Sequence, residues 1–178
     1  GGDLKKMFAE LYGKDTGCAR GKGGSMHLVA PEVWLMGCSA IVASTIPVAV
    51  GDALAARLKG SDRVSVAVFG DGAVDEGVFF ESANFADLKS LPILFICENN
   101  GYAIHSKVAE RHKETELYKI GQGIGLAGRR LDGNDAGAVY ATAREAVESI
   151  RAGGPPLLLE YRTCRWHEHV GPGLDFHE

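Results

Sequence analysis

The sequence contains no apolar run long enough to span a membrane. Its longest mostly apolar stretch, residues 40–56, is interrupted by Ser44, Thr45, Pro47 and Asp52, whereas a membrane helix needs about 20 consecutive apolar residues. The first residues show none of the charge and apolar pattern of a secretory signal peptide. We therefore expect a protein that does not enter a membrane.

Paired cysteines and clustered basic residues are also missing. The four cysteines, at positions 18, 38, 97 and 164, are widely separated and form no C-x-x-C motif. This pattern is typical of buried thiols in a reducing compartment rather than of a disulfide framework, so we expect a cytoplasmic protein. No Lys/Arg-rich stripe occurs and the formal net charge is −4, which argues against nucleic acid as a partner.

The remaining composition is that of an ordinary globular protein. Of the 178 residues, 46% are hydrophobic and 24% are charged, which is enough for one domain with a substantial core. We expect a single domain over residues 1–178. Because the chain begins with Gly1 and Gly2 rather than Met, we expect a fragment or a short member of a longer family.

Apolar periodicity and glycine breaks predict alternating helices and strands. Residues 13–40 form a glycine-rich loop, and at that length such a loop is usually functional or part of an interface. The helix over residues 45–59 is apolar around most of its circumference, so we expect it to lie buried between two layers or subunits. The full set comprises helices at 3–11, 45–59, 76–90 and 135–152, and strands at 63–69, 92–97 and 157–162.

The strands at 63–69 and 92–97 are short apolar runs bounded by turn residues, as expected of strands covered on both faces. Strand and helix alternate along the chain, which favours a parallel sheet with right-handed crossovers. The sequence therefore predicts the α/β class, with a doubly wound, mostly parallel sheet and helices on both faces.

Polar motifs follow two of these strands. The segment Gly70-Asp71-Gly72 ends the first strand, and Asn99-Asn100-Gly101 ends the next. In an open parallel sheet, ligands bind outside the carboxyl ends of the strands, and neighbouring strands lie roughly 4.8 Å apart. If these two strands are neighbours, their polar side chains converge on one point.

The residue types at this point suit Mg²⁺ and a phosphate. Mg²⁺ is usually held by one or two carboxylates together with phosphate oxygens of a substrate. Asp71 offers a carboxylate, Asn100 an amide oxygen and Tyr102 a main-chain carbonyl, while Gly72 allows backbone N–H groups to approach phosphate. A lone Gly-Asp-Gly is most often only a turn, so the hypothesis depends on the two motifs occurring together.

Both motifs, separated by 26 residues, resemble the thiamine-diphosphate-binding fingerprint. The stretches "FAELYGKDTGCARGKGGSMHL", "IVASTIP", "LDGND" and "YRTCRWHEH" extend the likeness to the alpha subunit of 2-oxo acid dehydrogenases of the pyruvate, branched-chain and acetoin types. The resemblance covers the chain from about Leu4 onward. It implies the thiamine-diphosphate-binding fold, and a chain that lacks the N-terminal and C-terminal parts of longer relatives.

The resemblance also implies roles for individual residues. Asp71 and Asn100 would ligate Mg²⁺ by their side chains, and Tyr102 by its main-chain carbonyl. Other positions would contact thiamine diphosphate: the diphosphate would meet Gly70, Gly72 and Ala73, and the aminopyrimidine would be supported by backbone groups of Ala40 and Val42. His169 matches a histidine near the diphosphate and the reacting carbon, and is the candidate catalytic residue.

The family's reaction implies partners for this chain. The resemblance implies that the glutamate that activates the cofactor belongs to the beta subunit of the family. No Glu of this chain matches it. We therefore expect a chain that is inactive alone and works in an oligomer, with a beta-type subunit and a lipoyl-bearing acyltransferase. Oxidative decarboxylation with acyl transfer to lipoyl would be the activity, on a 2-oxo acid or acetoin that the sequence does not identify.

Two other functions remain open at this point. A truncated, non-catalytic paralogue would keep the fold and the interface without turnover, and another nucleotide- or phosphate-binding α/β protein would use the same strand ends differently. Two alternatives to a catalytic role remain for the histidines near the end of the chain. They could bind a separate transition metal, or they could be solvated side chains without a function; these residues are His167, His169 and His177.

Overall fold

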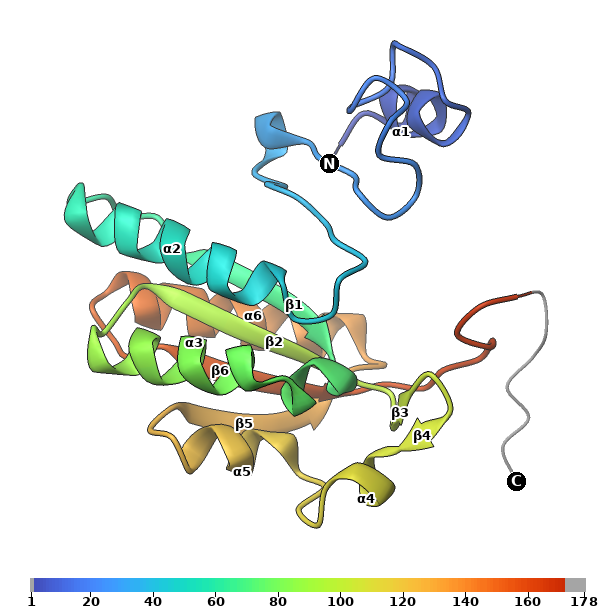
Figure 1. Cartoon of the computed structure of the whole chain (residues 1–178). Helices are drawn as coiled ribbons and strands as arrows, with labels where there is room; N and C mark the ends of the chain where they lie inside the picture. Colours follow the sequence, from blue (N-terminus) through green and yellow to red (C-terminus); the bar gives the residue numbers. More distant parts are fainter. Residues whose placement is uncertain (1, 172–178) are drawn as a thin grey trace. The chain divides into compact units, whose positions relative to one another are not determined.

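The computed structural model describes residues 2–171 of the chain. These residues belong to two compact units, unit 1 (Gly1–Thr45) and unit 2 (Ile46–Glu178), whose elements are labelled in Figure 1. The expected single domain over residues 1–178 stays a prediction. None of the helices within residues 2–171 combines the length and the apolar character that a membrane crossing requires.

The described part of unit 1 includes the helix α1 (Leu4–Leu11) and a turn of 3₁₀ helix, η1 (Pro31–Val33). The helix begins after Asp3, whose carboxylate accepts a hydrogen bond from the Lys5 N–H at 2.8 Å. This contact satisfies one of the backbone donors that every helix start leaves without a partner. Asp3 is therefore the N-cap of α1.

The glycine-rich loop of unit 1 is organised around one buried carboxylate. Glu10 is 1% exposed, and its two oxygens accept hydrogen bonds from four backbone N–H groups of the loop, those of Ala19 (2.7 Å), Gly21 (2.9 Å), Gly23 (2.6 Å) and Gly24 (3.3 Å). Although burial opposes it, this set of donors lowers the pKa of Glu10.

Close packing around Glu10 explains why the loop is rich in glycine. A Cβ on Gly17 would lie 2.4 Å from a carboxylate oxygen of Glu10, and a Cβ on Gly21 would lie 2.4 Å from the backbone of Gly13. Gly21 also has a φ of +72°, which side chains disfavour. The loop is thus a closed structure within unit 1 rather than an open turn.

Unit 2 is built on a four-stranded sheet whose pairs are all parallel, with the order β1-β2-β6-β5. The expected α/β fold is confirmed. The strands are β1 (Ser65–Gly70), β2 (Ile93–Asn99), β5 (Ala127–Asp132) and β6 (Leu157–Arg162). The helices are α2 (Thr45–Leu58), α3 (Gly77–Leu88), α4 (Val108–Arg111), α5 (Leu117–Gln122) and α6 (Ala136–Arg151).

Helices cover both faces of this sheet (Figure 1). On one face, the ring of Phe69 in β1 lies 5.8 Å from that of Phe79 in α3, and Ser65 donates a hydrogen bond to Asp52 of α2 at 2.6 Å. On the other face, α6 packs Ala146 and Ile150 against a buried cluster from β2 and β6. Burying such side chains supplies most of the stability, at about 1.5–3 kcal/mol for each large one.

One strand differs from the sequence prediction. In β1, which lies at the edge of the sheet, Val66 and Val68 are 45% and 53% exposed, so the described residues of this chain cover only one face of the strand. In α2, one face is buried, but Val48 and Leu58 are exposed. The described residues therefore do not enclose α2, and the expected cover by a second subunit stays a prediction.

The edge strand β5 was not foreseen, because its sequence "AGRRLD" lacks an apolar run. As an edge strand it tolerates Arg129 and Arg130, which form ion pairs with Glu145 and Glu116 respectively. Pairing with β6 decides its conformation, and no local pattern reveals that pairing.

The four cysteines form no disulfide, but the expectation of buried thiols is wrong for Cys38 and Cys164, which are exposed, while Cys18 is partly buried. Cys97 lies in β2 and is fully buried, and burial raises the pKa of its thiol well above the ordinary range. Such a thiol stays protonated and unreactive.

Replacing Glu10 by Gln should loosen the glycine-rich loop, because a carboxamide cannot accept all four N–H groups. Amide hydrogen exchange at Ala19, Gly21 and Gly23 should become faster by on the order of tenfold. In the wild type, the lowered pKa of Glu10 means that this protection is present above the unfolded-state pKa and lost as the pH falls through the folded one. Glu32→Gln, at an exposed residue of unit 1, is the control and should change neither the exchange rates nor their pH dependence. Unchanged exchange rates in Glu10→Gln would contradict the prediction.

Candidate functional site

The two polar motifs leave the sheet at the same edge. Strands β1 and β2 are parallel neighbours, with Gly70 opposite Glu98 in their register. Asp71 therefore follows the end of β1 directly beside the end of β2, where Asn99 and Asn100 stand. The condition on which the predicted convergence depends, that these two strands are neighbours, is met.

Close backbone packing brings the loops after β1 and β2 together. Asp71 begins a 3₁₀ segment, η2 (Asp71–Asp75), and Asn100 leads into the hairpin of β3 (Tyr102–Ala103) and β4 (Ser106–Lys107). A Cβ on Gly72 would lie 2.9 Å from the Cβ of Ala103. Glycine at position 72 is thus required for this approach, independently of any ligand.

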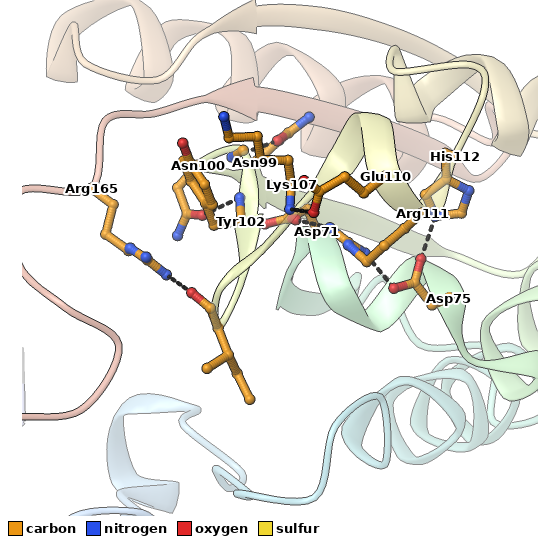
Figure 2. Close-up of polar contacts among 12 residues, drawn as sticks. Asp71, Asp75, Asn99, Asn100, Tyr102, Lys107, Glu110, Arg111, His112 and Arg165 are labelled. Atoms are coloured by element: carbon orange, nitrogen blue, oxygen red, sulfur yellow. Dashed lines mark hydrogen bonds and ion pairs between the residues drawn. The ribbon is translucent and has the colours of Figure 1, made fainter. Parts of the chain in front are cut away.

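The side chain of Asn100 shapes the second loop. Its Oδ1 accepts a hydrogen bond from the Tyr102 N–H at 3.0 Å (Figure 2). An amide oxygen has two lone pairs, so Oδ1 can still take part in a second interaction, such as ligation of a cation.

Asp71 is the electrostatic centre of the site. Its residue exposure is 1%, and this burial raises the pKa of its carboxyl, while the adjacent Arg111 guanidinium opposes the rise. An ionised carboxylate so far from water requires a cationic partner.

Arg111, the last residue of α4, supplies that positive charge. Its Nη2 contacts Asp71 Oδ2 and its Nη1 contacts Asp75 Oδ2, so that the guanidinium bridges the two ends of η2. His112 contacts the other oxygen of Asp75 through Nε2. Figure 2 shows Arg111 beside both carboxylates, with His112 on the side of Asp75.

The donor set fits a hard divalent cation. Asp71, Asn100 and the Tyr102 carbonyl offer only oxygen, and the guanidinium already stands in for a positive charge on Asp71. Within residues 2–171, no group of three His, Cys, Asp or Glu side chains is placed to hold a metal ion. The expected Mg²⁺ site has a single acidic side chain, so it is not a site of that kind. The alternative transition-metal site involves His177, which lies outside the described residues.

Asn99 has a different environment from Asn100. It is buried, and its Nδ2 donates to Glu160 Oε1 at 2.7 Å, while its Oδ1 accepts from the Gly101 N–H at 3.0 Å. Glu160 is fully buried in β6 and also accepts from the Tyr118 N–H at 3.0 Å. Asn99 therefore ties the end of β2 to β6 and holds the loop that begins at Asn100.

Arg165 connects the segment after β6 to the hairpin. Its Nη1 donates to the Ile104 carbonyl at 2.7 Å, and its guanidinium carbon lies 5.1 Å from the centre of the Tyr102 ring. Ile104 has a φ of +56°, a strained conformation for a β-branched residue. His169 follows in the same segment and is exposed; its catalytic role stays a prediction.

The other expected cofactor contacts divide between the units. Gly70 ends β1, and Ala73 is buried in η2 beside Asp71, so both belong to the same strand end. Ala40 and Val42 belong to unit 1, where both are exposed. The roles of all four residues stay predictions.

A hollow of about 780 Å³ opens at the carboxyl ends of β5 and β6 and is lined in part by Arg130, Asp132 and Arg162. It is not the Asp71 site, because β6 and β5 are the second and third strands from β1. The motifs that carry the sequence prediction lie elsewhere on the sheet edge.

Sequence reasoning missed Glu160 and Arg111. A single acid within the apolar strand "LLLEYR" is a usable signal, since a buried charge needs a partner. Arg111 carried no comparable signal, because it lies in an ordinary polar stretch and only the fold brings it to Asp71.

Comparison with known proteins agrees with this geometry. The family model described as "Dehydrogenase E1 component" matches residues 1–171. The chain belongs to the dehydrogenase E1 component family. Its similarity to pyruvate dehydrogenase E1 component alpha subunits is 41% identity over 169 residues for the protein of Rhizobium meliloti (strain 1021), covering 95% of this chain and 49% of the relative.

Other relatives of this E1 component chain show the same relation. The somatic, mitochondrial alpha subunit of Pan troglodytes is 41% identical over 175 residues, covering 97% of this chain and 44% of its own length. The alpha subunit of Rickettsia felis is 39% identical, and the match covers 95% of this chain and 52% of that relative. The chain thus spans about half the length of the relatives it matches.

A solved structure shares the fold. The X-ray structure of a candidate thiamin diphosphate-dependent enzyme from Mycobacterium smegmatis matches with a TM-score of 0.53 and 28% identity, over 67% of this chain and 22% of that one. The E1 family and this neighbour agree with the resemblance carried by the two polar motifs.

Replacing Asn99 by Ala should destabilise unit 2 by roughly 1–3 kcal/mol, because Glu160 loses a buried donor. Urea denaturation would measure the change. Gln122→Ala serves as the control, since Gln122 is exposed and its one hydrogen bond is long at 3.4 Å. Equal stability of the two variants would show that the Asn99–Glu160 contact does not hold the strand ends.

Proposed function

We propose that this chain is the part of an alpha-type E1 subunit that binds thiamine diphosphate through Mg²⁺. It would serve the oxidative decarboxylation of a 2-oxo acid, or the corresponding reaction of acetoin, with acyl transfer to lipoyl. The observation that carries the proposal is the convergence of a buried carboxylate, Asp71, and the Asn100 loop at the carboxyl ends of two adjacent parallel strands.

Each residue of the strand ends has a proposed task. Asp71 and Asn100 hold the cation by their side chains, and Tyr102 by its main-chain carbonyl. The backbone of Gly70, Gly72 and Ala73 faces the diphosphate, where a single acid avoids the repulsion that a second carboxylate would add. When bound, thiamine diphosphate supplies the carbanion-stabilising chemistry that decarboxylation needs.

Further tasks fall to the segments outside the strand ends. Ala40 and Val42 support the aminopyrimidine through their backbone, and His169 acts near the reacting carbon. A beta-type subunit contributes the glutamate that activates the cofactor, and a lipoyl-bearing acyltransferase receives the acyl group. The unpaired cysteines, including the buried Cys97, agree with a reducing compartment, and we propose the cytoplasm.

One observation favours a second candidate, a non-catalytic paralogue. Asp71 is already neutralised by Arg111, so a chain that binds no metal would be electrostatically complete. The two candidates differ in whether thiamine diphosphate binds in the presence of Mg²⁺.

Calorimetric titration separates them. We expect thiamine diphosphate to bind with Mg²⁺ and not with excess chelator, and Asp71→Asn to weaken binding by at least about 100-fold, since loss of even outer-shell partners weakens metal sites by about 10–100-fold. Asp132→Asn, at the exposed end of β5, is the matched control. Thermal melting should show that both variants fold. A wild-type chain without Mg²⁺-dependent binding would favour the non-catalytic paralogue.

The chain by itself should not turn over a 2-oxo acid. With Mg²⁺ and thiamine diphosphate present, release of labelled carbon dioxide from pyruvate should stay at the background rate, because the activating glutamate is expected on a partner. Decarboxylation by the isolated chain would show that this glutamate is not needed from a beta-type subunit.

A further inference from the structure

The predicted metal ligand already has a counter-ion in the structure. The Asp71 side chain is 2% exposed and that of Arg111 is 14% exposed, so their ion pair is shielded from water. Arg111 reaches Asp71 from α4, 40 residues further along the chain. An exposed ion pair contributes little to stability, whereas removing one partner of a shielded pair leaves an uncompensated buried charge and is costly.

A divalent cation and this guanidinium exclude each other. Mg²⁺ ligands lie about 2.0–2.1 Å from the ion, so a cation on Asp71 would stand within a few ångströms of the Arg111 charge. At that separation, and with little water between them, like charges repel strongly. The single negative charge of the carboxylate cannot compensate both cations, so binding of the divalent ion favours release of the guanidinium.

Arg111 has a place to go. Asp75 contacts both Arg111 and His112 and is partly exposed, at 32% of its side chain. Within residues 2–171, the Nε of Arg111 is buried and has no acceptor, so the bridging position leaves one donor unsatisfied. Moving the guanidinium onto Asp75 alone would keep an ion pair and allow water to reach that donor.

We propose that Arg111 is the resident counter-ion of Asp71 in the metal-free chain, and that the divalent cation displaces it toward Asp75. The inference rests on the proposed function, since it takes Asp71 as the metal ligand. Arg111 is therefore a competitor of the metal. The Val108 N–H at the start of α4 donates to the Gly101 carbonyl at 3.0 Å, so the helix that carries Arg111 is attached to the loop that carries Asn100.

The experiment titrates the chain with Mn²⁺, which uses the same oxygen ligands as Mg²⁺, and follows free Mn²⁺ by electron paramagnetic resonance. Titrations are run without and with thiamine diphosphate. Arg111→Gln should bind Mn²⁺ tighter than the wild type by on the order of tenfold, a usual size for coupled binding events. The exposed Lys113, two residues further along, gives the control Lys113→Gln, which removes the same charge and should bind like the wild type.

Thermal melting gives a second readout. Without metal, Arg111→Gln should melt below the wild type, because the buried Asp71 charge loses its partner, and saturating Mn²⁺ should narrow that gap, since the variant binds the cation more tightly. A purely structural Arg111 would leave the gap unchanged. If Arg111→Gln does not fold, Arg111→Lys tests the same point, since an ammonium lacks the planar fork of N–H donors with which the guanidinium spans both carboxylates and should compete less with the metal.

The outcomes separate this inference from the proposed function. Equal or weaker Mn²⁺ binding by Arg111→Gln, with a wild type that binds, overturns the displacement and leaves the proposed function intact. Wild-type affinity in Asp71→Asn, or no binding by any of the folded chains, contradicts both. If Arg111→Gln binds Mn²⁺ more tightly than the wild type, and Asp71→Asn does not bind it, the results support both the displacement and the proposed function.

Discussion

A negative charge removed from water at a strand end is the constraint on which the site depends. Asp71 is buried where η2 packs against the β3–β4 hairpin. A buried carboxylate requires a cationic partner, because it has lost its hydration. The structure meets this demand with Arg111. In the proposed cofactor-bound chain, a metal ion would meet the same electrostatic requirement.

The rest of unit 2 serves to hold that charge in place. Parallel pairing of β1 with β2 sets Asp71 beside the Asn loop, and the Asn99–Glu160 contact fastens that loop to β6. Arg165 holds the strained turn at Ile104 from the segment that also carries His169. The three contacts come from distant parts of the chain, so the site is a product of the whole sheet.

The glycine-rich loop of unit 1 illustrates how a motif can have a structural cause. Its glycines allow four backbone N–H groups to surround the carboxylate of Glu10. A glycine-rich segment in an E1 component invites a phosphate-binding interpretation, yet here the anion at its centre belongs to the chain itself. That carboxylate satisfies the backbone of the loop without any ligand.

Local apolar periodicity and turn residues were enough to predict the α/β class, the strands β1, β2 and β6 and the Asp71 and Asn100 motifs, because they mark these features directly. They gave no sign of the edge strand β5, of the exposed face of β1, or of the partners Glu160 and Arg111. Those depend on which elements become neighbours, and neighbours 40 or 61 residues apart leave no local pattern. The cation that stands against Asp71 could be identified from the folded chain alone, since charge pairing in a buried site follows from packing rather than from sequence distance.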